Sequence, residues 1–355
     1  MGPLIAGSVE AQQRARGHVL HGIELGRPGK QLGFAGLSHS DNVHDNGLIP
    51  VPVAVISSGT GPTALLVAGT HGDEYEGQVV LHELIRSLEP EEVNGTVIIV
   101  PAANAPAVRA GTRVSPIDGG NLNRSYPGGE RGGPTDQVAD LISGALLPLA
   151  DVVIDLHSGG SNSTYLPSLF IYRGPDEQAW ARKVSAARAM GLPYVMAVAP
   201  RLEPGSLSTA GDDAGVLTLS TELGGGGTVH PGILADARRG VLSLLAHAGI
   251  LPTQPGTEPP PSPGQAAEPV WLELVADSPV MTTTPGIFEP LVELGQRVRA
   301  GDPVARVHAI DDLTRAQEEY TARVDGMVAI LRRPAMVAHG NYLVHIAPEI
   351  EAPRH

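Results

Sequence analysis

Short β-like runs alternate with helical patterns along the first 250 residues of the chain, and most of these runs are continuously apolar. The runs are at 52–57, 63–69, 96–102, 151–157 and 216–223. A run of this kind predicts a strand buried on both faces, because a strand with one exposed face would alternate apolar and polar residues. The helical patterns are at 74–88, 134–149, 176–190 and 231–249. Their alternation with the runs predicts an α/β fold, a mixed sheet with helices on both faces.

A proline-rich stretch at 252–268 interrupts this alternation. Proline favours an extended spacer, and the stretch has no pattern that could form a packed face. We therefore expect a linker at 252–268, a larger domain before it at 1–251, and an all-β domain after it at 269–355. Residues 1–50 are interpreted as an N-terminal β extension of the larger domain.

The segment after the linker consists of short β-like runs separated by Gly and Pro. Residues 286–307 and 326–346 resemble the two halves of a biotinyl/lipoyl-type barrel-sandwich module. Such carrier modules need a lysine at a hairpin tip, but the only lysines of the chain are Lys30 and Lys183. The barrel-sandwich fold is therefore expected, and the carrier function is excluded.

The composition excludes several classes of protein. Lys and Arg number 24 and Asp and Glu number 38, a net charge of −14. Nucleic-acid backbones and anionic membranes attract clustered cations, so neither is expected as a partner. The absence of cysteine excludes disulfides and thiolate catalysis. Because no apolar run approaches the roughly 18 residues of a transmembrane helix, and the N-terminus lacks a secretory pattern, we expect a cytoplasmic protein.

The segment THGDEYEG at 70–77 directly follows a predicted strand. Its His71 and Glu74 are three residues apart, about one helical turn, so both side chains can converge if a helix starts here. An imidazole nitrogen and a carboxylate oxygen at this spacing are suitable zinc ligands. The alternative is a helix N-terminus with acidic residues that complement its dipole, next to a surface histidine.

The segment DLHSGG at 155–160 supplies His157 at the end of another buried strand. Ligands of open α/β sheets bind at such strand ends, so His157 can meet His71 and Glu74 around one point. Two His and one Glu, with a fourth position left for water, form a catalytic zinc set. Taken alone, His157 is better explained as a core or strand-end histidine, and only the combination with His71 and Glu74 favours a metal site.

The segment TELGGGGTVHPG at 221–232 also ends a predicted strand. Its Glu222 would lie at the same edge, where a carboxylate beside a zinc-activated water serves as general base and then as proton donor. The alternative is a glycine-rich turn with an exposed glutamate. His230 is interpreted as a neighbour of the following helix N-terminus and not as a fourth ligand.

A polar, turn-rich segment at 111–128 carries two arginines and two asparagines: Arg113, Asn121, Asn123 and Arg124. A guanidinium can hold a carboxylate through two parallel hydrogen bonds, and a second can stabilise developing negative charge. The alternative is a solvated loop. Asp118 in this segment could hold an arginine or cap a turn, and the sequence leaves both open.

Taken together, H-x-x-E, the later D-x-H, the NLNR segment and the strand-ending TELG resemble the succinylglutamate desuccinylase/aspartoacylase family. The resemblance covers the chain from about residue 48 onward. It implies a zinc amidohydrolase with a carboxypeptidase-like α/β domain and a C-terminal β domain. Within the family, the motifs are most similar to those of the N-acetyl-L-2,4-diaminobutyrate deacetylases of ectoine degradation.

The resemblance also implies roles for individual residues. One Zn²⁺ per subunit would be held by His71, Glu74 and His157. Glu222 would be the general base and acid, and Arg113 would polarise the scissile carbonyl. The implied ligands of the substrate α-carboxylate are Asn123 and Arg124.

The implied reaction is hydrolysis of N2-acetyl-L-2,4-diaminobutanoate to L-2,4-diaminobutanoate and acetate. Alternatives are a deacylase of the N-acetylaspartate or N-succinylglutamate type and a metallocarboxypeptidase. A non-catalytic metal- or ligand-binding protein is disfavoured, because Glu222 and Arg113 are both present. Asp212 and Asp213 are candidate partners for the ammonium group of a diaminobutyrate.

The partner expected from this interpretation is a small N-acetyl amino acid, handled by a homo-oligomer, in the simplest case a dimer. Some aspartoacylases also use a tyrosine of the C-terminal domain. Its counterpart here, among Tyr320 and Tyr342, is left open by the sequence.

Overall fold

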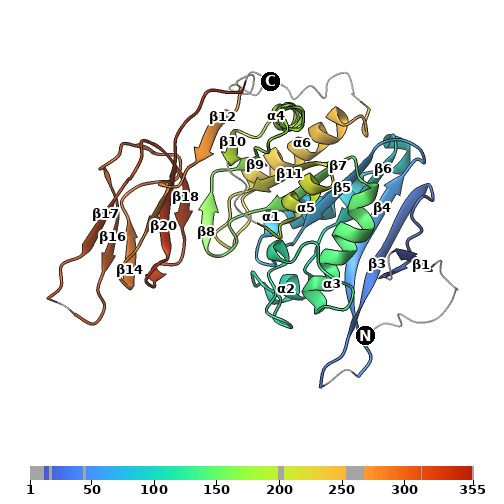
Figure 1. The fold of residues 1–355 in the computed structure, drawn as a ribbon, viewed down its shortest axis with the longest axis horizontal. Coiled ribbons are helices and arrows are strands. Elements are labelled where there is room, and N and C mark those ends of the chain that lie inside the picture. The colour runs from blue at the N-terminus through green and yellow to red at the C-terminus, as the bar shows by residue number, and fades with distance from the viewer. Residues whose placement is uncertain are drawn as a thin grey trace.

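A computed structural model describes residues 12–15, 18–42, 45–198, 204–252, 268–312 and 314–353. The predicted linker lies almost wholly outside these described residues, so the domain boundaries at 251 and 269 stay a prediction. The fold class is confirmed, because a large mixed sheet with helices on both faces is followed by antiparallel sheets near the C-terminus (Figure 1).

Within the described residues, the large sheet has eleven strands in the order β1-β2-β3-β4-β6-β5-β7-β11-β9-β10-β12. Its first six strands along the chain are β1 Gln12–Ala15, β2 His18–His21, β3 Gly29–His39, β4 Gly47–Ser57, β5 Thr63–Ala68 and β6 Thr96–Val100. The others are β7 Val152–His157, β9 Ser168–Tyr172, β10 Tyr194–Val198, β11 Leu217–Glu222 and β12 Val270–Leu274. Strands β6, β5, β7 and β11 run parallel in the centre. Their carboxyl ends therefore share one edge of the sheet.

Strand β12 comes from the segment after the predicted linker and yet belongs to the large sheet. It pairs in parallel with β10, from Tyr194↔Val270 to Val198↔Leu274. The chain after the linker thus first completes the edge of the larger sheet and only then forms sheets of its own.

Helices cover both faces of the large sheet (Figure 1). On one face pack α1 Tyr75–Ser87, α4 Glu177–Met190 and α6 Pro231–His247. On the other face pack α2 Ala105–Ala110, α3 Pro134–Asp140 and α5 Leu207–Asp213. Shorter helical turns are Pro90–Glu92, Leu122–Arg124, Leu141–Leu146 and Leu147–Leu149. None of the helices that the structure describes is long and apolar enough to cross a membrane.

The predicted helix at 134–149 is regular only in its first half. After α3 the chain continues as a π-helical turn and then a 3-10 turn. Pro148 lies in this last turn, and its missing N–H prevents a regular helical ladder from continuing through it.

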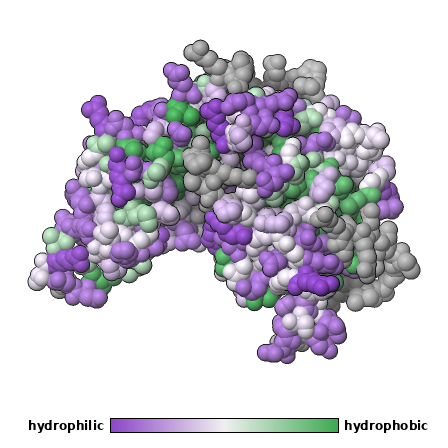
Figure 2. All heavy atoms as spheres, viewed as in Figure 1, coloured by the Kyte–Doolittle hydropathy of each residue, from purple (hydrophilic) through white to green (hydrophobic). Residues whose placement is uncertain are grey.

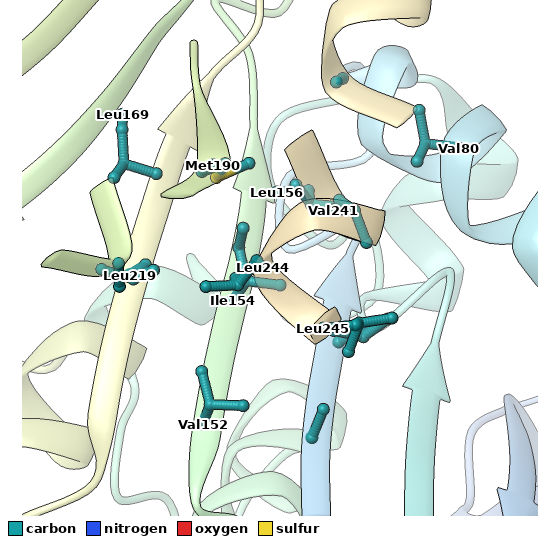
Figure 3. Close-up of a cluster of buried hydrophobic side chains, with 14 of the residues drawn as sticks. Val80, Val152, Ile154, Leu156, Leu169, Met190, Leu219, Val241, Leu244 and Leu245 are labelled. Carbon is teal, nitrogen blue, oxygen red and sulfur yellow. The ribbon is translucent and has the colours of Figure 1, made fainter. Parts of the chain in front are cut away.

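The apolar runs supply two hydrophobic cores at once. In β5, Leu66 packs in the core under α1 and α6, and its neighbours Leu65 and Val67 pack in the core on the opposite face. Figure 3 shows the first core, where Ile154 of β7 lies beside Leu244 of α6. Because successive strand residues point to opposite faces, a strand between two helical layers must be apolar at every position.

The C-terminal segment forms two further antiparallel sheets around a separate apolar core. One contains β13 Pro279–Met281, β20 Tyr342–Ala347, β18 Gly326–Arg332 and β15 Arg297–Val298. The other contains β17 Glu318–Thr321, β16 Pro303–His308, β14 Gly286–Pro290 and β19 Met336–Val337. Strand β8, Ser163–Tyr165, leaves the large sheet region and pairs with β18, from Ser163↔Arg332 to Tyr165↔Ile330. This pairing brings the C-terminal sheets against the edge where the central strands end (Figure 1).

Candidate metal and active site

The turn between β5 and α1 places His71 beside Glu74. Nδ1 of His71 lies 2.6 Å from Oε1 of Glu74. Glu74 is the N-cap of α1, with extended backbone, so the two residues meet in the turn ahead of the helix and not across its first turn. Gly72 between them lies against Ala107, where an added Cβ would be 2.1 Å from the carbonyl carbon. The turn can therefore take this shape only with glycine at position 72.

Strand β7 delivers His157 to the same point. Nδ1 of His157 lies 2.7 Å from Oε2 of Glu74, and the backbone N–H of Ser158 donates to the same oxygen over 3.2 Å. The ring centroids of His71 and His157 are 5.1 Å apart. The three side chains that the sequence predicted to meet therefore do lie together, all of them buried.

The Nε2 atoms of both imidazoles, which point away from Glu74, are hydrogen-bonded to acceptors. Nε2 of His157 donates to Oδ2 of Asp155 over 2.8 Å, and Nε2 of His71 donates to Oδ1 of Asn121 over 3.1 Å. Thr70 in turn donates to Oδ1 of Asp155 over 3.0 Å. When Nε2 keeps its proton for such an acceptor, the lone pair of a neutral imidazole is on Nδ1. Both Nδ1 atoms face Glu74, as they would in a metal site.

Burial and neighbouring charges shift the pKa values of Glu74 and His157 in opposite directions. Burial alone would raise the pKa of Glu74, but the charges of His71 and His157 and their hydrogen bonds lower it well below its ordinary value. Burial would also lower the pKa of His157, but Asp155 and Glu74 raise it well above its ordinary value. A divalent cation bound by the three groups would stabilise the same carboxylate charge, and it would require neutral imidazoles as ligands.

The donor set fits zinc. One ligand atom from each of His71, Glu74 and His157 lies within 4.8 Å of the others. Two imidazole nitrogens and one carboxylate oxygen are ligands that zinc accepts in catalytic sites, which keep one position open. The hydrogen bonds from Asp155 and Asn121 are the second layer that orients such ligands.

Arg113 lies at the open side of the group. Its Nη1 is 3.3 Å from Oε1 of Glu74 and 3.3 Å from Nδ1 of His71, and its side chain is 44% exposed. The guanidinium can therefore reach both the proposed metal position and a ligand in solvent. Such a cation stabilises negative charge that develops on a nearby oxygen.

Asn123 and Arg124 come from the helical turn Leu122–Arg124 and line the same cavity. The side-chain oxygen of Asn123 accepts a hydrogen bond from the backbone of Leu207 over 3.3 Å, which leaves its amide nitrogen as the end that can donate to a ligand. Arg124 donates to the backbone oxygen of Asn123 over 2.7 Å. This contact ties the guanidinium to the turn that carries it.

Glu222 ends β11 directly beside His157. The two strands are parallel, and Glu222 is in register with His157. Residues in register on neighbouring strands project to the same face of a sheet, and both of these side chains line the cavity. Glu222 thus lies next to the metal group without being part of it, as a general base requires.

The cavity around these residues has a volume of about 680 Å³. Its floor is formed by the ends of the central strands, and one wall is formed by the C-terminal sheets. The residues of that wall, on β18 and β20, are Ile330, Arg332, Tyr342, Leu343 and His345. Figure 2 shows that the surface is hollowed between the two parts of the molecule.

Several open alternatives are decided by the contacts. Asp118 caps its turn, because it accepts from the backbone N–H of Gly120 over 3.2 Å, and it also accepts from the backbone and hydroxyl of Thr135 at the start of α3, both over 2.8 Å. Asp212 accepts from Lys183 over 2.7 Å, and neither it nor Asp213 lines the cavity. His230 is the N-cap of α6, as interpreted from the sequence.

The two tyrosines of the C-terminal segment also differ. Tyr320 is bonded to Thr282 over 3.0 Å and is not among the residues that line the cavity. Tyr342 does line it.

Sequence reasoning gave no role to Asp155 or to Asn121. Of the wall residues on β18 and β20 it named only Tyr342, as one of two candidate tyrosines. Asp155 had a local signal, since a residue two before His157 on a strand must point to the same face. The other wall residues had no such signal. They reach the cavity only because β18 pairs with β8.

The sequence is similar to known proteins over most of its length. A profile of the succinylglutamate desuccinylase/aspartoacylase catalytic domain matches residues 60–248. The N-alpha-acetyl-L-2,4-diaminobutyric acid deacetylase of Halomonas elongata is 39% identical over 338 residues, which are 93% of this chain and 95% of that protein.

Solved structures are similar to the chain as well. The product-bound ectoine utilization protein EutE (DoeB) from Ruegeria pomeroyi has a TM-score of 0.88 at 38% identity, over 95% of this chain and 99% of that one. A succinylglutamate desuccinylase/aspartoacylase from Rhodobacter sphaeroides has a TM-score of 0.87 at 34% identity, over 93% and 98% of the two chains.

Proposed function

The chain belongs to the succinylglutamate desuccinylase/aspartoacylase family of amide hydrolases, and from this we propose that it is a zinc-dependent deacetylase. The proposed substrate is N2-acetyl-L-2,4-diaminobutanoate, and the products are L-2,4-diaminobutanoate and acetate. The observation that carries the proposal is that His71, Glu74 and His157 converge in one cavity with Glu222 and Arg113.

The residues divide into those that hold the metal and those that act on the substrate. His71, Glu74 and His157 would hold one Zn²⁺ per subunit. Bound zinc would supply the Lewis acid that polarises the acetyl carbonyl and lowers the pKa of the attacking water. Asp155 and Asn121 keep the two imidazoles oriented through their Nε2 atoms.

Proton transfer is assigned to Glu222. Its carboxylate takes a proton from water as the oxygen of that water attacks the acetyl carbon, and Arg113 donates hydrogen bonds to the carbonyl oxygen as negative charge builds there. When the C–N bond breaks, Glu222 returns the proton to the leaving nitrogen. One water is consumed, and one acetate and one amine are formed.

The substrate carboxylate is assigned to the turn Leu122–Arg124. Arg124 can offer a guanidinium and Asn123 an amide N–H₂ group, both from one turn. Holding the carboxylate at this turn would place the neighbouring amide near the metal position, which is how binding lowers the barrier to attack.

A second candidate function has one observation in its favour. Arg332 adds a third guanidinium to the cavity, after Arg113 and Arg124. This charge would suit a substrate with two carboxylates, such as an N-acylated aspartate or glutamate.

The test is a comparison of purified, metal-analysed protein on three substrates. We expect stoichiometric zinc and a kcat/KM for N2-acetyl-diaminobutyrate well above those for N-acetylaspartate and N-succinylglutamate. A preference for either diacid would support the second candidate, and no hydrolysis of any of the three by the zinc-loaded protein would refute both. A cytoplasmic location and a homodimer also remain proposals, for which cell fractionation and light scattering are the measurements.

A further inference from the structure

The proposed substrate carries a second amino group, which is an ammonium ion at neutral pH and needs an acceptor. Among the described residues that line the cavity, only Glu74 and Glu222 are acidic. Glu74 belongs to the proposed metal group, and Glu222 is the proposed general base. Asp212, the carboxylate suggested by the sequence, is occupied by Lys183 and lies outside the lining. Among the described residues of the lining, an acceptor that has no role in the proposed metal group or in proton transfer is therefore a neutral group.

The C-terminal wall supplies such a group at His345. On β20, His345 is in register with Ile330 of β18, and both line the cavity. The next pair in register, Val344 and Leu331, packs into the core of the C-terminal sheets instead. Because successive strand residues point to opposite faces, this register directs the His345 ring toward the cavity.

The imidazole of His345 has its hydrogen-bonding capacity unused. The His345 ring makes an edge-to-face contact with the ring of Tyr342, with centroids 4.7 Å apart and planes inclined by 60°. Within the part of the chain that the structure describes, neither ring nitrogen is hydrogen-bonded to protein. Burial lowers the pKa of His345 to about 4, so the ring is neutral at physiological pH and one of its nitrogens is an acceptor.

We propose that His345 binds the second amino group of the substrate and thereby makes the C-terminal segment the specificity element for diamino acids. This rests on the proposed deacetylase function. The ammonium would donate to the free ring nitrogen, and the half-exposed ring of Tyr342 beside it offers a face that attracts cations.

Arg332 lies on the same wall and needs a separate role. Its Nε donates to the backbone oxygen of Pro334 over 3.0 Å and its Nη2 to that of Met336 over 3.2 Å. These bonds turn the guanidinium toward the end of β18.

The experiment measures discrimination between two substrates that differ only in the amino group. The ratio of kcat/KM for N2-acetyl-2,4-diaminobutyrate to that for N-acetyl-2-aminobutyrate is determined for the zinc-loaded wild type, His345→Leu and His345→Gln. We expect His345→Leu to lower the ratio about tenfold or more, as for loss of a hydrogen bond to a charged group. His345→Gln keeps an acceptor and should retain a clearly higher ratio than His345→Leu.

The matched control is His308→Leu, the same change at a histidine of β16 that does not line the cavity. Its ratio should equal that of the wild type. The proposal is overturned if His345→Leu keeps the wild-type ratio, or if His345→Gln and His345→Leu lose it equally, because shape would then be the cause. A wild type that prefers a diacid substrate refutes the proposed function itself, whatever the variants do.

Discussion

Oδ2 of Asp155 lies 2.8 Å from Nε2 of His157, two residues further along the same strand. The carboxylate keeps a proton on Nε2 and so leaves Nδ1, on the opposite side of the ring, to face Glu74. Thr70 holds the other oxygen of Asp155 in place. The proposed metal position is thus defined by a buried chain of hydrogen bonds that begins outside the ligands themselves.

This relationship makes Asp155→Asn an informative change. An amide cannot provide the same charge against Nε2, so we expect zinc affinity to fall about 10–100-fold while the fold is retained. Competition with a chelating dye measures the affinity. Asp45→Asn, in the exposed hairpin between β3 and β4, is the control and should bind zinc like the wild type.

Glu222→Gln separates catalysis from metal binding. The substitution removes the proton acceptor beside His157 but leaves the three proposed ligands, so kcat should fall about 10²–10⁴-fold with zinc content unchanged. Glu74→Gln should instead lose the metal. Near-normal turnover in Glu222→Gln would refute the assignment of Glu222 as base.

Removal of the metal should affect both activity and stability. Chelation should abolish turnover, and added zinc should restore it. Zinc at 100 times its Kd should raise the free energy of unfolding by about 2.7 kcal/mol, because it binds only the folded state. Thermal unfolding with and without zinc measures this, and His157→Ala should show almost no zinc-dependent shift in Tm.

Gly72→Ala tests the turn that carries His71 and Glu74. The new methyl group would meet the backbone of Ala107 at 2.1 Å, and relief of such overpacking costs about 1–3 kcal/mol. We expect a lower Tm and weaker zinc binding. Gly129→Ala is the matched control, since an added Cβ there meets nothing within 4 Å. Equal behaviour of the two variants would show that position 72 does not require glycine.

The lowered pKa of the buried His345 imidazole predicts that the free energy of unfolding depends on pH. Burial lowers its pKa to about 4 from an ordinary value of 6.5, so the unfolded chain binds this proton more readily than the folded protein between those pH values. Stability should therefore rise with pH from 4 to 6.5, and His345 should contribute up to about 3 kcal/mol of that rise. Denaturant unfolding at pH 4.5 and pH 7 measures it. His345→Leu should show a smaller rise than the wild type, and an identical rise would contradict a neutral, buried imidazole.

Residue order was enough to predict the five strands β4, β5, β6, β7 and β11, the class of fold and the proposed metal ligands. Strand β5 had to be buried on both faces because Leu65 and Leu66 leave no polar side for solvent. His71 and Glu74 are three residues apart, and strand ends such as that of His157 meet at one edge of a parallel sheet. These relationships depend on spacing within a segment or on a general property of sheets, so they can be read from residue order.

Tertiary structure alone decided what surrounds those ligands. Asn121 reaches His71 from a loop fifty residues away, and His345 reaches the cavity through the pairing of β8 with β18. Strand β12 joins the large sheet although the chain before it is rich in proline. Such contacts depend on which segments, far apart in the sequence, pack against each other. The spacing of residues within one segment does not show which other segment it will contact. The proposed metal ligands could therefore be predicted from the sequence, whereas the packing of the wall on β18 and β20 against the cavity could not.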